Sequence, residues 1–431
     1  MLKKILRSNL FYNMVITFYE FLVYIVAYIG LFATSFYVIH MIKSRKKVYV
    51  MKDDKTVSII IPAYNEAKSI AQTIDSALAL DYSKERLEII VVDDGSKDDT
   101  YKIAKKYETS DFPIIRVFTK LNGGKGSALN FGIDKSKSDI IITMDADTFA
   151  NPDALKKMIG RFHSPEVMAV TPSMGVYKPK GILQKVQQIE YYLGVFLRKS
   201  FANINAIHVT PGAFSAYRRE FFVKYGGYDT TNITEDLEIC LRMQSKNYTV
   251  ENAPEAVIYT HVPNKFKSLM YQRRRWYTGL TSNLWAYRHL FSPRYGALGI
   301  LVLPNAVISV ILSVFLSFYA VVLAFIQTRK DLLNLIAINF QFKNVIELNS
   351  FVFTHFLYTL FSLKIFLITL LFLTVMAFYL YFSERKMKHK EGVKISFIWF
   401  LYLYSLLFAF WWFISFVYTL FKKKVEWREN K

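Results

Sequence analysis

Long apolar runs near both ends of the chain constrain its fold more than any other feature. About 20 apolar residues cross the core of a bilayer. Hydrophobic residues make up 53% of the chain, which is too high for an ordinary soluble protein. We therefore predict one membrane span before a polar central segment and three after it. The four apolar runs that reach this length are Ile16–Ile42, Ala297–Ile326, Ser362–Phe382 and Ser396–Phe421.

The net charge of +21 at pH 7 lies mainly in the flanking segments. Residues 51–295 hold 34 basic and 27 acidic side chains, whereas the two flanks hold 21 and 7. Basic residues beside apolar runs are typical of the cytoplasmic ends of membrane spans. We therefore predict a multi-pass protein of the cytoplasmic membrane whose central domain is cytoplasmic, from the basic runs Lys43–Lys47 and Arg385–Lys390. This topology would place the basic run Lys422–Lys424 on the extracytoplasmic side, which the positive-inside rule disfavours. This distribution argues against nucleic acid as a partner.

We predict four segments along the chain. They are an N-terminal segment with one span (1–50), a cytoplasmic domain (51–260), an interfacial segment (261–296) and a C-terminal region with about three spans (297–431). The single cysteine, Cys240, excludes an internal disulfide and a zinc site built from several cysteines.

Strand-like and helix-like runs alternate in the first part of the central domain. Such an order predicts an α/β fold with a mostly parallel, doubly wound sheet, whose binding loops gather at the carboxyl ends of the strands. Neither G-x-G-x-x-G nor G-x-x-x-x-G-K-[ST] is present, which argues against dinucleotide oxidoreductases and P-loop NTPases. The expected strands are Val57–Ile61, Leu87–Val92, Ile114–Phe118 and Ile140–Met144, and the expected helices are Glu66–Leu80, Asp98–Tyr107 and Gly126–Lys135.

Acidic residues follow two of these expected strands. Asp93–Ser96 reads either as an ordinary Asp-Gly turn or as a site where a carboxylate hydrogen-bonds a uracil or a ribose. Asp145-Ala146-Asp147 reads either as a helix cap or as a pair of carboxylates that holds Mg²⁺ or Mn²⁺ against a diphosphate. The position of both motifs at strand ends favours the ligand-binding interpretation.

Three further motifs also have two interpretations. Gly123–Gly126 is a loop with a solvated lysine, or a backbone that approaches phosphate while Lys125 supplies charge. Thr234-Glu235-Asp236 is a helix start with Thr234 as N-cap, which would also place Asp236 in the first turn, facing a cleft. Gln272–Trp276 is a membrane-interface anchor, or a block that offers a guanidinium to a diphosphate and an indole to a sugar ring. The fixed order of all these motifs favours the functional interpretations.

From Val57 to about Gly279 the chain resembles the inverting family 2 glycosyltransferases, in particular their membrane-embedded processive branch. That branch includes poly-N-acetylglucosamine, hyaluronan, chitin-oligosaccharide and cellulose synthases. The resemblance implies a nucleotide-sugar-binding domain of the GT-A type, plus an α-helical transmembrane region. The matching stretches are Pro62–Glu66, Asp93–Ser96, Gly124–Asn130, Asp145–Asp147, Pro211–Phe214, Thr234–Asp236 and Gln272–Trp276.

The resemblance also implies a role for each matching residue. Asp236, with Glu235, would be the catalytic base that deprotonates the acceptor hydroxyl. Asp147, assisted by Asp145, would hold Mg²⁺ or Mn²⁺ on the diphosphate. The acceptor would contact Gly212, Gln272 and Trp276. The remaining residues implied in binding the nucleotide-sugar donor are Ala63, Glu66, Asp93, Asp94, Lys125, Asp145 and Arg275.

Two alternatives stay open from the sequence. The same motifs would serve a non-processive transferase that modifies a membrane lipid, and a silent transporter subunit could retain the domain without using it. The expected partners are a UDP-sugar, with UDP-N-acetylglucosamine favoured weakly, a growing glycan or lipid acceptor, and membrane lipids. A second copy or an accessory subunit would complete a channel if these spans are too few to form one.

Overall fold

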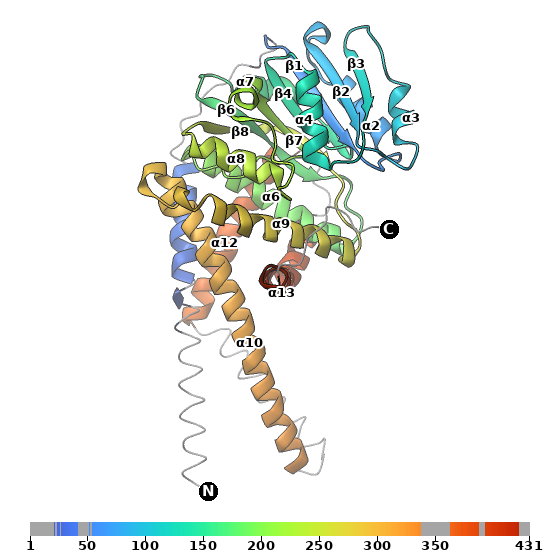
Figure 1. Cartoon of the computed structure of the whole chain (residues 1–431). Coiled ribbons are helices and arrows are strands. Elements are labelled where there is room, and N and C mark those ends of the chain that lie inside the picture. The colour runs from blue at the N-terminus through green and yellow to red at the C-terminus, as the bar shows by residue number, and fades with distance from the viewer. Residues whose placement is uncertain are drawn as a thin grey trace. The chain divides into compact units, whose positions relative to one another are not determined.

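The computed structural model describes residues 54–337, 363–387 and 393–421, together with residues 21, 24–25, 27–41 and 51. The chain forms two compact units, which Figure 1 shows together with the element labels. The larger unit comprises Tyr37–Pro304 and Leu380–Lys431, and the smaller unit comprises Met1–Phe36 and Asn305–Tyr379.

The larger unit is built around one eight-stranded sheet with the order β3-β2-β1-β4-β7-β6-β8-β5. Four of the seven strand pairings are parallel, and β7 runs antiparallel to both β4 and β6. The strands are β1 (Val57–Ala63), β2 (Leu87–Asp93), β3 (Ile114–Thr119), β4 (Ile140–Met144), β5 (Thr148–Ala150), β6 (Val167–Val176), β7 (Phe214–Arg218) and β8 (Thr249–Thr260).

The first half of this sheet confirms the predicted alternation of strands and helices. β1 lies between β2 and β4 in parallel register, with Ile59 opposite both Ile89 and Ile142. The order β3-β2-β1-β4 therefore reverses at β1, and in parallel α/β sheets such a reversal is where ligands commonly bind, beyond the carboxyl ends of the strands. The intervening helices are α2 (Ile70–Leu78), α3 (Thr100–Lys105) and α4 (Lys125–Lys135), and a 3₁₀ turn, Lys84–Arg86, precedes β2.

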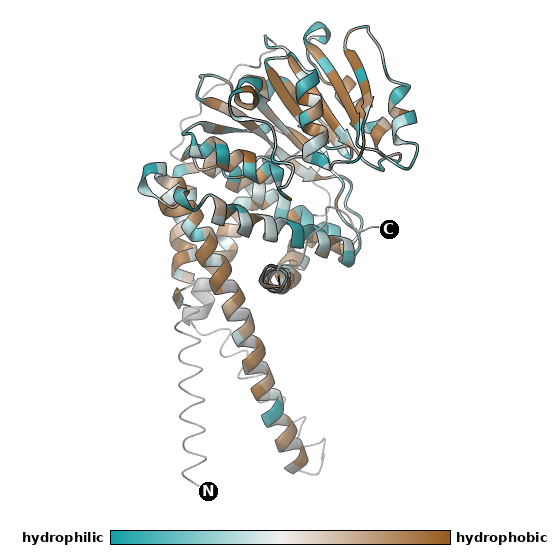
Figure 2. Ribbon diagram, in the orientation of Figure 1, coloured by the Kyte–Doolittle hydropathy of each residue, from teal (hydrophilic) through white to brown (hydrophobic). Residues whose placement is uncertain are grey.

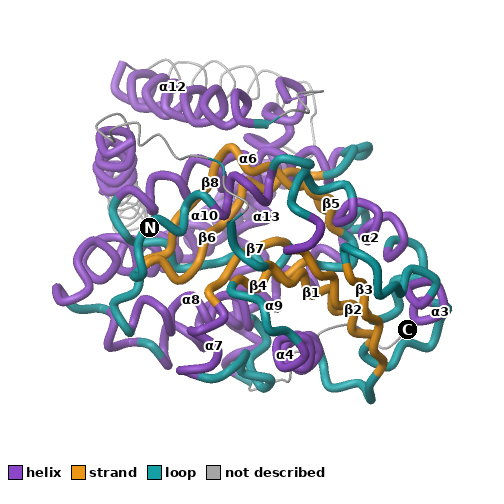
Figure 3. The backbone as a smooth tube through the Cα atoms, turned by 90° about the horizontal axis from the view of Figure 1, so that it is seen from above, coloured by secondary structure: helices purple, strands orange, loops and turns teal. Residues whose placement is uncertain are grey.

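Two hydrophobic cores cover the two faces of the sheet. Because successive strand residues point to opposite faces, Ile59 and Ile61 pack with α2, α3 and α5 (Ala154–Ile159), whereas Ile60 packs on the other side. That second core contains side chains from α4, α7 (Arg219–Tyr225) and α8 (Glu235–Ser245). Figure 3 shows helices on both sides of the sheet, and Figure 2 shows the strands coloured mostly hydrophobic. The carboxyl ends of the strands are therefore held by a rigid sandwich.

A layer of longer helices completes the larger unit. α6 (Ile182–Asn203), α9 (Phe266–Ala286) and α13 (Val393–Leu420) pack together, and Tyr277 of α9 stacks on Trp412 of α13 with ring centroids 4.3 Å apart. Ser396 of α13 donates a hydrogen bond of 3.1 Å to Gln188 of α6. Helix α9 carries the Gln272–Trp276 block.

Beyond α9 the chain passes through the short turns Arg288–Leu290 and Pro293–Tyr295 and the π-helical segment Leu298–Val302 into α10 (Leu303–Ala337). The smaller unit contains helical residues 27–36 and most of α10 and α12 (Leu363–Lys386). In the described part of the chain, no helix combines the length and the apolar character that crossing a membrane requires. The four spans thus remain predictions, and the basic runs Lys43–Lys47 and Lys422–Lys424 lie outside the described residues.

Candidate active site

The two aspartates at the end of β2 have different surroundings. The Asp94 carboxylate accepts hydrogen bonds from Lys120 Nζ at 2.7 Å and from the backbone N–H groups of Gly123, at 3.1 Å, and Gly124, at 2.7 Å. Asp93 Oδ2 accepts a hydrogen bond of 2.9 Å from Thr119 Oγ1. Asp94 therefore shapes the loop that precedes α4.

Asp93 keeps one acceptor atom for a ligand. Its side chain is only 2% exposed, and its Oδ1 atom is buried without a hydrogen-bond partner among the described residues. A buried carboxylate oxygen without a partner is costly, so this atom is the better candidate for hydrogen-bonding a nucleoside. Nearby, the Ala63 carbonyl at the end of β1 accepts the Asp94 N–H at 2.8 Å. The predicted binding role of these residues stays a prediction.

The Asp145-Ala146-Asp147 motif follows β4, as the sequence predicts. Burial, together with the nearby Asp145 and Glu66 carboxylates, raises the pKa of Asp147 to about 7. Thr260 Oγ1, at the end of β8, donates to Asp147 Oδ1 at 3.4 Å. The sheet therefore concentrates carboxylates at this point.

Lys125 joins this acidic group to a second one. Its Nζ atom lies 2.7 Å from Asp145 Oδ1 and 3.2 Å from Glu235 Oε1, and its side chain is only 9% exposed. Burial disfavours the lysine charge, but Asp145, Glu235 and Asp236 outweigh burial and raise the pKa of Lys125 above its ordinary value. One buried cation therefore connects three motifs that are far apart in the sequence.

Asp236 lies in the first turn of α8, where the sequence predicts it. Its Oδ2 atom accepts the Gly212 N–H at 3.2 Å, and its Oδ1 atom accepts the Leu237 N–H at 2.9 Å. Burial and the Glu235 carboxylate raise the pKa of Asp236 to about 6, while Lys125 and Arg275 act in the opposite direction. Asp236 is therefore mostly charged at neutral pH, yet more basic than an exposed aspartate.

The loop that carries Gly212 has no room for a side chain. A Cβ atom on Gly212 would lie 2.7 Å from Lys125 Nζ and 3.4 Å from Asp236 Oδ2. A larger residue would have to displace the lysine ammonium from its carboxylates. The Pro211–Phe214 stretch thus brings its backbone directly against the charged site.

The arginines on α9 do not share one function. Arg273 is 1% exposed and forms two hydrogen bonds of 2.6 Å with the Glu190 carboxylate on α6. Its guanidinium carbon lies 4.3 Å from the centroid of the Trp276 ring. The charge of Arg275 instead opposes the rise in the pKa of Asp236, whereas Arg273 packs against the Trp276 indole.

The structure brings together most of the predicted site residues. Lys125, Asp145, Glu235, Asp236 and Gly212 lie in direct contact. Gln272, whose Oε1 atom is buried without a hydrogen-bond partner among the described residues, and Trp276 lie on α9.

Sequence reasoning missed several residues that support the site. They are Thr260, which donates to Asp147, and Glu190, which pairs with Arg273. It also missed Asn232, in the loop before α8, and Gly279 and Asn283 on α9. One feature of the sequence could have indicated them: Gly279 and Asn283 follow Arg275 at steps of four residues, which places all three on one face of a helix.

The donor set is suited to a metal shared with a substrate. Among the described residues, no group of three or more His, Cys, Asp or Glu side chains forms a metal cage by itself. Mg²⁺ commonly binds one or two carboxylates and completes its shell with substrate phosphates and water. Asp147 and Asp145 supply such carboxylates, and a divalent cation would offset the burial and the neighbouring Asp145 and Glu66 charges that raise the pKa of Asp147.

The central part of the chain is similar in sequence to known glycosyltransferases. Residues 58–226 match the family model described as glycosyl transferase family 2. Over 227 residues the chain is 34% identical to poly-beta-1,6-N-acetyl-D-glucosamine synthase of Staphylococcus aureus (strain COL) and 32% identical to that of Staphylococcus epidermidis, covering 52% of this chain and 54% of each relative. The chain thus matches about half the length of these curated relatives.

A solved structure supports the fold. A mannosyltransferase from Pyrobaculum calidifontis, in complex with GDP-Man and Mn²⁺, superposes with a TM-score of 0.58 and 21% identity, covering 73% of this chain and 91% of that one. This likeness shows the α/β fold alone. The family-model match, which covers residues 58–226, supports the predicted glycosyltransferase family in the central part of the chain.

Proposed function

We propose that this protein is an inverting glycosyltransferase that extends a β-linked polysaccharide from a UDP-sugar. The observation that carries this proposal is the contact of Lys125 with Asp145 on one side and with Glu235, the neighbour of Asp236, on the other. A cation in that position serves the leaving diphosphate and the attacking hydroxyl together. The names of the relatives, which specify an N-acetylglucosamine polymer, favour UDP-N-acetylglucosamine as donor.

The donor would bind at the carboxyl ends of β1, β2 and β4. The vacant acceptor atom of Asp93 suits an imide N–H, the donor that uracil presents. Asp94, Ala63 and Glu66 would border the nucleoside. Asp147 and Asp145 would hold Mg²⁺ or Mn²⁺, which when bound neutralises charge on the diphosphate.

Asp236 would act as the general base. Its carboxylate takes the proton of the acceptor hydroxyl while that oxygen forms a bond to the anomeric carbon. The bond from that carbon to the diphosphate oxygen breaks, and UDP leaves with the electron pair. Lys125 and Arg275 stabilise the charge that develops on the leaving group. Because attack comes from the side opposite the diphosphate, an α-linked donor gives a β-linked product.

The acceptor would lie between the Gly212 loop and α9. Trp276 offers an aromatic face that Arg273 and Glu190 hold in place, and Gln272 offers a buried amide oxygen. An aromatic face of fixed orientation suits the apolar side of a sugar ring. Such a platform would retain the chain end between additions, which is what a processive enzyme requires.

We further propose that the protein lies in the cytoplasmic membrane as a multi-pass protein and helps to translocate its product. The support is the pattern of four long apolar runs with basic residues beside them. A second copy or an accessory subunit would complete the channel. In the alternative function, the acceptor is a membrane lipid that receives a single sugar.

The test is donor turnover by the purified full-length chain in nanodiscs with Mg²⁺ or Mn²⁺. UDP release and product size would be followed with UDP-N-acetylglucosamine, UDP-glucose and UDP-glucuronic acid. The variant Asp236→Asn should lose UDP release, whereas Asp134→Asn, an exposed carboxylate on α4, should retain it. A high-molecular-weight product supports the proposal, and a short lipid-linked product supports the alternative. Turnover of no donor, or an active Asp236→Asn variant, would contradict both.

A further inference from the structure

One face of α9 lies against the start of α8. Arg275, Gly279 and Asn283 follow one another at steps of four residues, so they form a single stripe along the helix. Arg275 acts electrostatically on Asp236, at the first turn of α8. The other two residues contact Thr234, the residue that caps this helix. The stripe therefore connects the Gln272–Trp276 block to the catalytic turn.

Gly279 lets the backbone of α9 lie directly against the Thr234 side chain. A Cβ atom at this position would lie 2.2 Å from Thr234 Oγ1 and 2.4 Å from Thr234 Cγ2. Such distances are far shorter than a van der Waals contact. Only glycine therefore allows α9 to approach Thr234 this closely.

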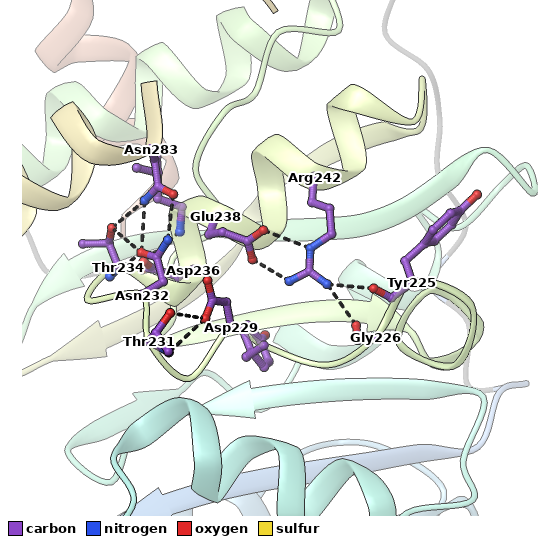
Figure 4. Close-up of polar contacts among 12 residues, drawn as sticks. Tyr225, Gly226, Asp229, Thr231, Asn232, Thr234, Asp236, Glu238, Arg242 and Asn283 are labelled. Atoms are coloured by element: carbon purple, nitrogen blue, oxygen red, sulfur yellow. Dashed lines mark hydrogen bonds and ion pairs between the residues drawn. The ribbon is translucent and has the colours of Figure 1, made fainter. Parts of the chain in front are cut away.

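One turn further along, two asparagines form a closed hydrogen-bonded pair, which Figure 4 shows. Asn283 Nδ2 donates to Asn232 Oδ1 at 3.1 Å and to Thr234 Oγ1 at 3.0 Å, and Asn232 Nδ2 donates to Asn283 Oδ1 at 2.8 Å. Asn232 Oδ1 also accepts the Thr234 N–H at 3.1 Å. Asn283 is 1% exposed. A buried network in which each amide is satisfied holds its members in one arrangement.

The next turn of the two helices continues this contact. Tyr287, which caps the carboxyl end of α9, donates through its hydroxyl to Glu238 Oε1 at 2.5 Å. Glu238 pairs with Arg242, whose Nη1 atom donates to the carbonyls of Tyr225 at 3.0 Å and Gly226 at 3.1 Å (Figure 4). The carboxyl half of α9 is therefore fixed to α8 over two turns.

We propose that Asn283 is a positioning residue, which fixes the first turn of α8 through its contacts with Asn232 and Thr234. The Asp236 carboxylate in that turn is thereby held in place relative to Arg275 and Trp276 on α9. Asn283 contacts Thr234 rather than Asp236 itself. This inference rests on the proposed function, because it requires Asp236 to be the base and Trp276 to hold the acceptor. The distance between base and acceptor hydroxyl is then set by the contact between the two helices.

The experiment compares Asn283→Ala, Asn232→Ala and the double variant with the parent, using the full-length chain in nanodiscs. We expect kcat to fall about 10- to 100-fold in each single variant, because displacement of a reacting group by about 1 Å has that effect. The donor KM should change less than about threefold, because the donor site is not altered. The matched control is Ser282→Ala, the exposed neighbour of Asn283 on the same helix.

Two further measurements separate positioning from simple packing. The double variant should be no slower than either single variant, since the two amides act as one unit. The midpoint of the kcat/KM pH profile should shift in Asn283→Ala and not in Ser282→Ala. If Asn283→Ala does not fold, Asn283→Gln keeps an amide that can donate to Asn232 and Thr234 and accept from Asn232, and it should retain more than about a tenth of the parent kcat.

Several results would overturn the inference. Asn283→Ala with a lower Tm but an unchanged kcat and pH midpoint would make Asn283 a packing residue only. Additive losses in the double variant would show that the amides act separately. In both cases the parent enzyme still turns over donor, so the proposed function stands. A parent that turns over no donor would remove the proposed function and this inference together.

Discussion

The two halves of the sheet hold their functional side chains in different ways. The half that we propose to bind the donor, called here the donor half, consists of β1 to β4 with their loops, and the other half, proposed to bind the acceptor, is called the acceptor half. In the donor half, Asp94 is held by backbone N–H groups of Gly123 and Gly124. The acceptor half consists of β6 to β8 with α6, α8 and α9, and there Asp236 and Trp276 depend on helices that meet from distant parts of the chain. The donor half is thus assembled by loops at strand ends, whereas the acceptor half requires helix packing. Substitutions should therefore affect donor KM in the first half and kcat in the second.

The largest effect should come from Lys125→Met, because Lys125 contacts both halves. The substitution keeps the length of the side chain but leaves the Asp145 and Glu235 carboxylates without their shared cation. We expect kcat/KM to fall about 1,000-fold and the free energy of unfolding to fall by about 3 kcal/mol. UDP release and chemical denaturation measure the two effects. The control is Lys102→Met, which replaces an exposed lysine on α3. If kcat/KM of Lys125→Met stays within tenfold of the parent, Lys125 does not couple the two halves.

The next effect should come from Gly212→Ala in the acceptor half. The new Cβ atom would meet Lys125 Nζ at 2.7 Å, and the flexible lysine would move away from its carboxylates. We expect kcat to fall about 100-fold, with a change in Tm of no more than a few degrees. Gly181→Ala is the matched control, because a Cβ atom there meets nothing within 4 Å. A raised donor KM with an unchanged kcat would assign Gly212 to the donor half instead.

The pH profile should report the acceptor half through Asp236. Burial and Glu235 raise the pKa of Asp236 to about 6 against the opposing effects of Lys125, Arg275 and the Gly212 N–H. A base must be deprotonated, so kcat/KM should be half-maximal near pH 6, level off about one unit above it, and approach a tenfold fall per unit below it. Steady-state rates between pH 5 and 8 measure this. A profile without this acidic limb would exclude Asp236 as the base.

The same raised pKa predicts the sign of a stability effect. The folded state binds the Asp236 proton more tightly than the unfolded state, so ionisation of this group destabilises the fold as the pH rises from about 4 to 6. Asp236→Asn should therefore have a higher Tm than the parent at pH 7.5, and the difference should shrink at pH 4. A lower Tm at pH 7.5 would contradict this assignment.

The smallest effect should come from Asp94→Asn in the donor half. The substitution replaces one carboxylate oxygen by an amide N–H donor, which would lie against a backbone N–H or against the Lys120 ammonium. Two donors facing each other cannot form a hydrogen bond, so the loop before α4 would be disturbed. We expect the donor KM to rise about fivefold with kcat within about twofold of the parent. Asp99→Asn, an exposed aspartate nearby, should change neither value. A kcat effect larger than the KM effect would break the distinction between the two halves.

The sequence predicted the donor half better than the acceptor half for a physical reason. The strands β1 to β4 are short apolar runs, and parallel strands bring the residues that follow them to one edge of the sheet. Asp93 and Asp145 could therefore be located from local pattern alone. The strands β5 to β8 were not predicted, and β6 and β8 contain Pro172, Asn252 and Pro254, which interrupt an apolar pattern.

Residues that support the site were harder to predict than the residues within it. The partners Glu190 and Arg273 are 83 positions apart, and Asn232 and Asn283 are 51 positions apart. Their pairing depends on how α6, α8 and α9 pack, and no local periodicity encodes that. The resemblance assigned Arg275 alone to the donor and gave no role to Arg273, whose burial and contact with Glu190 only the structure shows.

The position of β4 in the sheet has a consequence for synthesis of the chain. β4 ends at Met144 and is flanked by β1 on one side, but its other neighbour, β7, begins only at Phe214. While the ribosome makes the intervening residues, the strand at the centre of the finished sheet has an open edge of apolar residues, which is the kind of edge that pairs with other chains. Slow translation between these strands should therefore lower the yield of folded protein, and chaperones that cover strand edges should restore it.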